Sequence, residues 1–127
     1  MAIGFGAAGT ADANAVRSLT PSYPAVSAGD YLLLEVAQKY ADRTVNTPSG
    51  WTALGSASGG AGTDGTVDEG NVKIWLYGKE ATGSESGTLS VTDTGGTASC
   101  FAARIFSMTK AGGESWSVSS AATASDN

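Results

Sequence analysis

Short runs of alternating apolar and polar residues dominate the chain and predict β-strands. Residues 31–36 form an apolar run just after the turn signal Ala28-Gly29-Asp30, which is typical of a buried strand. Residues 72–77 alternate strictly, with Val72, Ile74 and Leu76 on one face and Lys73, Trp75 and Tyr77 on the other. The same pattern predicts strands at 88–92, 99–106 and 116–118, and a weaker signal indicates strands at 3–5 and 15–19.

The alternation also predicts which side chains point inward. Leu89 and Val91 are expected to face the core. In the run 99–106, Phe101, Ala103 and Ile105 share one face, and Arg104 and Phe106 share the other. Residues 33–41 contain helix formers, but turn signals at Gly29-Asp30 and Thr47-Pro48 bound them, so we expect no helix there. The chain is therefore predicted to be all-β, an antiparallel β-sandwich that is jelly-roll-like or immunoglobulin-like.

Length and small residues suggest how the chain is organised. With 127 residues it is expected to form one domain spanning 1–127. Residues 55–71 contain six glycines and are predicted to be a long irregular connection. The ends, 1–14 and 119–127, are rich in Ala, Gly and Ser, and we interpret them as flexible arms that a partner surface would order.

Charge and composition exclude several function classes. Seven basic residues against twelve acidic ones give a net charge of -5, which disfavours nucleic acid and membrane surfaces as partners. Histidine is absent, so chemistry that needs an imidazole is excluded. The N-terminus does not resemble a signal peptide, so synthesis in a cytoplasm is expected. Cys100 is predicted to be a buried, inert thiol.

Few residues suggest chemistry. Asp64, Asp68 and Glu69 carry oxygen ligands of the kind that Ca²⁺ takes, but their spacing matches no calcium loop and a solvated loop explains them. Glu35 is the one carboxylate among apolar neighbours, and on a strand it points away from the face of Leu34 and Val36, to an exposed position or a salt bridge. A literal G-x-G-x-x-G at Gly4, Gly6 and Gly9 lacks the strand and helix that a nucleotide site needs. We therefore expect no enzyme activity, no metal and no cofactor.

The aromatic residues allow two interpretations. They are Trp51, Trp75, Trp116, Tyr23, Tyr31, Tyr40 and Tyr77. These rings either fill a core or subunit interface, or form a platform on which sugars stack. Because Trp75 and Tyr77 share one strand face, that face is a candidate interface, and Ile3 and Phe5 near the N-terminus are candidates as well.

Several of these segments together resemble a known family. The pieces are Pro24-Ala25-Val26-Ser27-Ala28-Gly29-Asp30 with Tyr31-Leu32-Leu33-Leu34, then Pro48-Ser49-Gly50-Trp51-Thr52, then the strand from Val72 leading into the turn Lys79-Glu80-Ala81-Thr82. Across about residues 24–106 the chain resembles a β-sandwich module of phage virion proteins. The terminal regions 1–23 and 107–127 do not match this module well.

The resemblance implies a non-enzymatic structural role. It suggests a capsid decoration or cement protein that binds the outer surface of the head and stabilises it. The implied partner is the major capsid protein or another virion protein, and the implied assembly is a homotrimer. The expected location is the outer surface of the capsid, after synthesis in the host cytoplasm. The alternative is a glycan- or receptor-binding module of a tail or head fibre.

Overall fold

The protein is an all-β fold in a computed structural model that describes residues 2–39, 43–60, 72–95 and 99–119. Its described strands are β1 (Ile3–Ala8), β2 (Asp12–Val16), β3 (Ser18–Leu19), β4 (Tyr31–Gln38), β5 (Thr52–Gly59), β6 (Val72–Glu80), β7 (Val91–Thr92) and β8 (Ser99–Lys110). All strand pairs are antiparallel, and the described residues contain no helix. The predicted all-β antiparallel class is therefore confirmed.

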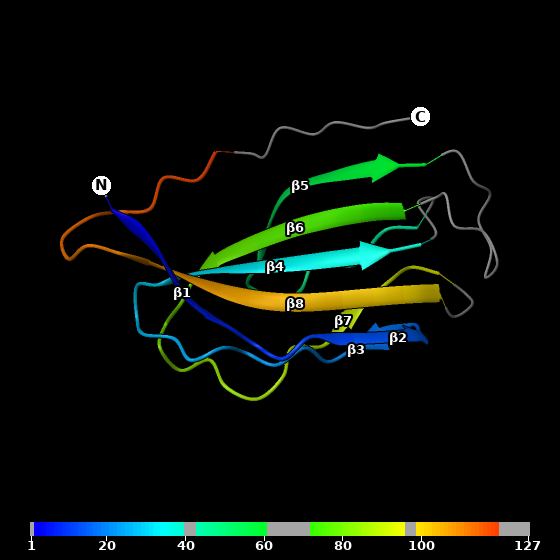
Figure 1. The fold of residues 1–127 in the computed structure, drawn as a ribbon, viewed down its shortest axis with the longest axis horizontal. Coiled ribbons are helices and arrows are strands. Elements are labelled where there is room, and N and C mark those ends of the chain that lie inside the picture. Colours follow the sequence, from blue (N-terminus) through cyan, green and yellow to red (C-terminus); the bar gives the residue numbers. More distant parts are fainter. Residues whose placement is uncertain (1, 40–42, 61–71, 96–98, 120–127) are drawn as a thin grey trace.

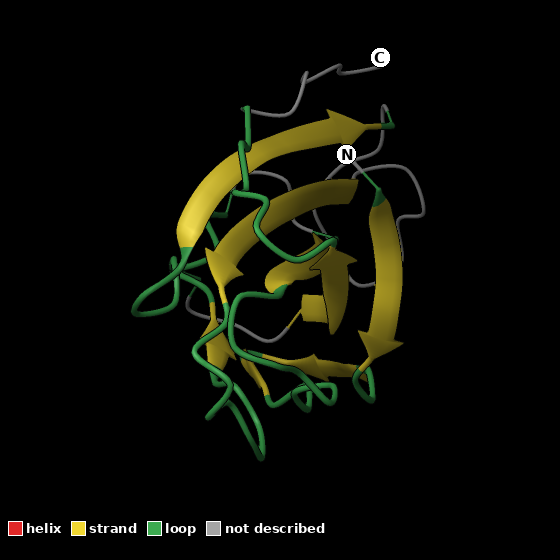
Figure 2. Ribbon diagram, turned by 90° about the vertical axis from the view of Figure 1, so that its left-hand side faces the viewer, coloured by secondary structure: helices red, strands yellow, loops and turns green. Residues whose placement is uncertain are grey.

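The strands form two layers. The large sheet has the order β1-β8-β4-β6-β5, with β2 also paired to β8, and the small sheet consists of β3 and β7 (Figure 1). Figure 2 shows the large sheet curving around the small one. This gives the large sheet an inner face that the small sheet covers and an outer face on its convex side, which makes the fold sandwich-like.

The core lies between the two layers. Alternate residues of β4, β6 and β8 point into it, and the buried apolar residues are Leu19, Leu32, Leu34, Val36, Val45, Trp51, Trp75, Tyr77, Ala81, Val91, Phe101, Ala103 and Ile105. Leu89 is partly buried and packs against this cluster. The inward positions predicted for β8 and for Leu89 and Val91 are thus confirmed. Trp51 is also buried, at the end of a turn in which its amide donates to the carbonyl of Pro48 at 3.1 Å.

The N-terminal segment forms one edge of the large sheet, where β1 and β2 follow one another along β8. We call each such position across the sheet a lane. β1 pairs with residues 106–110 of β8 and β2 pairs with residues 99–103, so both strands occupy the same edge. The lane is interrupted at Gly9, whose amide donates to the carbonyl of Ile105 at 2.8 Å. Within the segment 1–14, residues 3–8 and 12–14 are therefore paired sheet and not the flexible arm that composition suggested. Residues 120–127 of the other expected arm lie outside the described residues.

Several strand boundaries differ from the sequence pattern. Residues 55–59 belong to β5 and pair with β6, so this part of the expected irregular connection is a strand, while 61–71 lie outside the described residues. Backbone pairing with β6 holds β5 although its small side chains carry no hydrophobic alternation. Residues 116–118 form no strand, and within 88–92 only Val91–Thr92 is a strand. The weak signal at 15–19 corresponds to the end of β2 and to β3.

Candidate interaction surface

The large sheet carries a second apolar face, which no described strand covers. On β6, Val72 and Ile74 point to this outer face and are 39% and 42% exposed. On β4 and β8 the outer face carries Leu33, Ala37, Ala102, Phe106 and Met108, which are only partly buried. A sheet that is apolar on both faces while only one is covered is a candidate contact surface.

An apolar depression lies at one end of this face, where β4 ends and where β6 and β8 begin. Ala13 of β2, Ala102 of β8 and Ala37 of β4 stand directly opposite one another in register across three adjacent lanes. They line a depression of about 630 Å³, together with Val72 and Cys100 among others. Because alanine side chains are short, neighbouring larger residues rise above them. We call the five residues Ala13, Ala37, Val72, Cys100 and Ala102 the alanine hollow.

Lys39 also lines the depression, and two opposite charges lie beside the alanine hollow. Glu35 and Arg104 are direct register partners on β4 and β8, two residues along each strand from Ala37 and Ala102. Arg104 donates from Nε to the carbonyl of Gly9 at 3.0 Å, and its guanidinium lies 5.5 Å from the ring centre of Phe106. Glu35 is exposed, as predicted, and forms no ion pair with any described residue. Among the described residues, the Glu35 carboxylate therefore faces outward beside Arg104 without an ion-pair contact.

The candidate interface residues divide between the surface and the core. Ile3 and Phe5 on β1 are 55% and 64% exposed, and we call them the edge patch. Trp75 and Tyr77 are 6% and 2% exposed, so the predicted interface on their strand face is wrong. They point to the inner face, where the hydroxyl of Tyr77 donates to the carbonyl of Val45 at 3.1 Å. Burial raises the pKa of Tyr77 to about 12, although a hydrogen bond with Thr47 opposes the shift.

The aromatic residues do not assemble into a broad platform. Trp51 and Trp75 are in the core, and Tyr40 lies outside the described residues. Trp116 instead packs on Tyr31 with ring centres 5.4 Å apart, and its indole nitrogen donates to the carbonyl of Gly29 at 2.7 Å. Among the described residues, the half-buried pair Tyr31 and Trp116 is the part of the expected aromatic platform that remains accessible.

Cys100 is exposed, so the prediction of a buried thiol is wrong. The alternation that turns Phe101 and Ala103 inward necessarily turns Cys100 outward. Because Cys100 directly precedes the core residue Phe101 in the sequence, its side chain lies on the opposite face of the strand. On the outer face, Cys100 lines one side of the alanine hollow.

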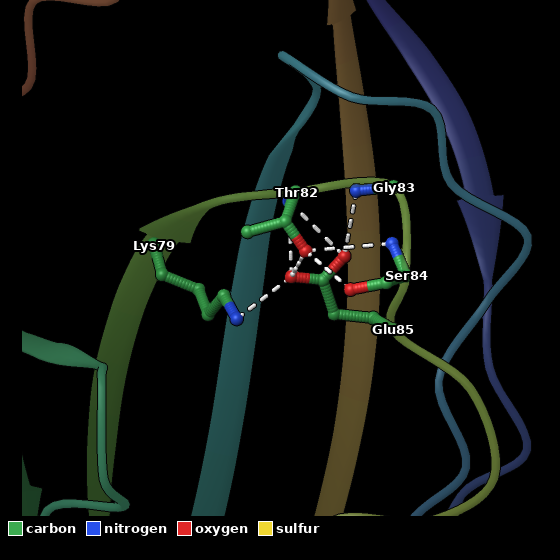
Figure 3. Close-up of polar contacts among 5 residues, drawn as sticks. All are labelled: Lys79, Thr82, Gly83, Ser84 and Glu85. Carbon is green, nitrogen blue, oxygen red and sulfur yellow. Dashed lines mark hydrogen bonds and ion pairs between the residues drawn. The ribbon is translucent and has the colours of Figure 1, made fainter.

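The clearest polar cluster is structural. After β6, the Glu85 carboxylate accepts from Lys79 Nζ at 2.8 Å, from the Thr82 amide at 3.0 and 3.1 Å and from the Gly83 amide at 3.0 Å (Figure 3). Burial raises the pKa of Glu85, but the hydrogen bonds from Lys79, Thr82 and the backbone outweigh it and lower the pKa to about 2. Because its oxygens are occupied by the turn itself, this carboxylate is not placed to act on a ligand.

A second buried cluster closes one end of the core. Asp93 accepts from the side-chain amide of Gln38 and from the Gly95 amide at 3.1 Å, and Arg43 lies 3.4 Å from the same carboxylate. The acidic residues Asp64, Asp68 and Glu69 lie outside the described residues. Within the described ranges, no group of three potential metal ligands occurs. The described residues also include no helix long and apolar enough to span a membrane.

Comparison of the chain with protein-family models, with curated proteins and with solved structures finds no match. The functional assignment therefore depends on the geometry of the surface and on the sequence resemblance. The residues that sequence reasoning missed are those of the alanine hollow and the exposed Val72 and Ile74. The sequence could have indicated a second apolar face, because both faces of the strand 72–77 carry large apolar side chains.

Proposed function

We propose that the protein is a non-enzymatic structural component of a phage virion, which decorates the outer surface of the head by binding the major capsid protein. The observation that carries the proposal is the edge patch. Ile3 and Phe5 project from a strand at the margin of the large sheet, where pairing of β1 with β8 already holds them in place. A preordered apolar patch loses little conformational entropy on binding, which favours protein–protein attachment.

Two further features support this assignment. The resemblance to phage virion modules covers most of the chain, and its Lys79–Thr82 segment is the turn that Glu85 stabilises. Glu35, the one carboxylate considered for catalysis, is exposed on the outer face, and the Glu85 carboxylate is held by its own turn. Both features suit a protein that works through stable contacts.

Binding to purified phage heads tests the proposal directly. The full chain is incubated with expanded heads, the heads are sedimented, and the bound copies are counted. We expect saturable binding at a fixed number of copies per head. Phe5→Asp should weaken binding by at least about tenfold, because it places a charge in an apolar contact.

A matched control separates attachment from general surface effects. Val118→Asp introduces the same charge at another exposed apolar residue, which is 44% exposed and lies beyond β8. This variant should bind heads like the unaltered chain. Absence of saturable binding to heads, or equal loss in both variants, would contradict the proposal.

The alternative role, a glycan-binding fibre module, would depend on Tyr31 and Trp116. Their ring contact and partial exposure are the one specific observation in its favour. A glycan array distinguishes the two roles. Glycan binding that is lost in Trp116→Ala, together with no binding to heads, would favour the fibre role.

A further inference from the structure

We propose that the outer face of the large sheet binds a second copy of this chain, related by a two-fold axis that runs parallel to the strands between β8 and β4. This goes beyond the attachment to heads, because it uses the alanine hollow and its surroundings and not the edge patch. Three properties of the face, namely its lane order, its relief and its charges, support the same axis.

Four adjacent strand positions of the large sheet lie evenly about the proposed axis. They are β2, β8, β4 and β6, and the gap between β8 and β4 is their midpoint, while β5 lies outside the contact beyond β6. Rotation about an axis in this gap places β8 of one copy over β4 of the other, and β2 over β6. Residues that share a cross-strand row then remain in the same row of the partner. An isologous contact of this kind closes with two copies.

Large and small side chains of the two faces are complementary in size under the same rotation. One row of the face contains Ala13, Ala102, Ala37 and Ile74, in lane order from β2 to β6. The rotation places the large, exposed Ile74 over Ala13 of the second copy. It places Ala37 over Ala102, where two short side chains let the sheets approach closely. Val72 precedes Lys73, which pairs with Gln38 at the end of the β4–β6 register, so the rotation brings Val72 towards Ala15 of the second copy.

The charges are complementary as well. Glu35 and Arg104 occupy the two central lanes at the same level. The rotation places Glu35 of each copy over Arg104 of the other, so two ion pairs form at the centre of the contact. Glu35 has no ion pair with described residues of its own chain, which leaves its carboxylate available. Opposite charges in these positions favour this register, since a shift along the strands would separate both Glu35–Arg104 pairs.

The size of the contact predicts a weak dimer. Four lanes about 4.8 Å apart, over eight residues rising about 3.3 Å each, span on the order of 500 Å² in projection. Because the outer face is convex, the two copies approach most closely along β8 and β4 and less closely at β2 and β6 (Figure 2). Stable complexes bury about 800 Å² per partner, so we expect a dissociation constant in the micromolar range. A two-fold pair would replace the trimer that the sequence resemblance implies.

Charge reversal in separate chains tests the register. Sedimentation velocity of the full chain over a wide concentration range should show a monomer–dimer equilibrium. Glu35→Arg and Arg104→Glu should each remain monomeric, because each places like charges opposite each other in a homodimer. An equimolar mixture of the two variants should form a heterodimer, in which every central charge again faces its opposite.

Association of the mixture cannot come from a restored contact within one chain, because residues 35 and 104 of each variant still carry like charges. Ser86→Arg and Ser86→Glu are the matched controls, because Ser86 is exposed in the loop between β6 and β7. Each control should dimerise like the unaltered chain. Arg104→Glu also loses the hydrogen bond to Gly9, so Ile74→Asp provides a second disruption at an exposed side chain, and it should abolish association while thermal unfolding stays near that of the unaltered chain.

Four results would overturn the proposal. These are a monomer at all concentrations, a trimer, dimers that persist in Glu35→Arg or Ile74→Asp, and failure of the mixed variants to associate. The result is independent of attachment to heads. A dimer that does not bind heads would contradict the proposed function alone, and a monomer that binds heads through Phe5 would contradict the dimer alone.

Discussion

Lys79 and Glu85 face each other across the turn that follows β6, with Lys79 Nζ 2.8 Å from Glu85 Oε1 (Figure 3). The side chains are 20% and 5% exposed, so the ion pair is shielded from solvent and from salt. The same carboxylate binds the amides of Thr82 and Gly83. One side chain thus determines the path of the chain as it leaves the large sheet for the small one.

This turn makes the protein sensitive to acid. The pKa of Glu85 is lowered from 4.5 to about 2, so folding favours its ionised form. The stabilisation is complete above a pH of about 4.5 and is lost as the pH falls towards 2. Glu85→Gln should lower the free energy of unfolding at neutral pH by about 2 kcal/mol, and the difference should shrink with acidification. Chemical denaturation at a series of pH values measures it.

Glu80→Gln is the control for this experiment. Its carboxylate is 58% exposed and lies 3.8 Å from Lys110. The change should stay within about 0.5 kcal/mol, because exposed ion pairs contribute little. An equal effect of both substitutions would contradict the special role of Glu85.

Gly9 is required by close backbone packing where the N-terminal lane is interrupted. A Cβ atom at this position would lie 1.9 Å from the carbonyl oxygen of Ser22, which is backbone and cannot rotate away. Gly9→Ala should therefore destabilise the fold by about 3 kcal/mol or more. Gly112→Ala is the control, because nothing lies within 4 Å of its added Cβ. Thermal unfolding of both variants measures the difference, and a mild effect at Gly9 would contradict its close approach to the Ser22 backbone.

Tyr77 should make the fold sensitive to strong base. Burial raises its pKa from 10.0 to about 12, so folding favours the neutral phenol. This stabilisation is present below a pH of about 10 and is lost as the pH rises through 12. In Tyr77→Phe, loss of the hydrogen bond to Val45 should cost about 1 kcal/mol at neutral pH. Above a pH of about 10, the unaltered chain should lose stability more steeply than the variant, and equal slopes in chemical denaturation would argue against a buried phenol.

Cys100 should react with thiol reagents in the folded protein. Its side chain is exposed on the outer face, so labelling does not require unfolding. We expect complete labelling under native conditions at low protein concentration, with a rate that depends little on mild denaturant. Labelling should slow at concentrations where a second copy covers the alanine hollow. Protection that is lost only on global unfolding would contradict the exposed position.

The apolar run 31–36 and the alternations at 72–77 and 99–106 predicted the centre of the fold well. Residues 31–36, 72–77 and 99–106 lie in β4, β6 and β8, and Phe101 and Ile105 face the core as expected. These three strands form the centre of the large sheet, where burial imposes a clear pattern. β5 was missed because backbone hydrogen bonds to β6, and not hydrophobic side chains, hold it in place.

The candidate site was only partly predictable. Ile3 and Phe5 are exposed, as an interface requires, but Trp75 and Tyr77 are buried. Strict alternation assigns Val72 and Ile74 to one face and Trp75 and Tyr77 to the other, and both sets are apolar. Local sequence therefore could not indicate which set the second layer covers. The alanine hollow was equally invisible, since it forms only when three separate segments align in register.

The sequence by itself determined that this chain forms antiparallel strands with two apolar faces, because the pleated backbone turns successive side chains to opposite sides. The tertiary structure alone decided which face became the core. Leu19 of β3 and Val91 of β7, far apart in the chain, come together in the small sheet and cover the inner face. On the outer face the apolar residues stay exposed or half-buried, because no described strand covers them.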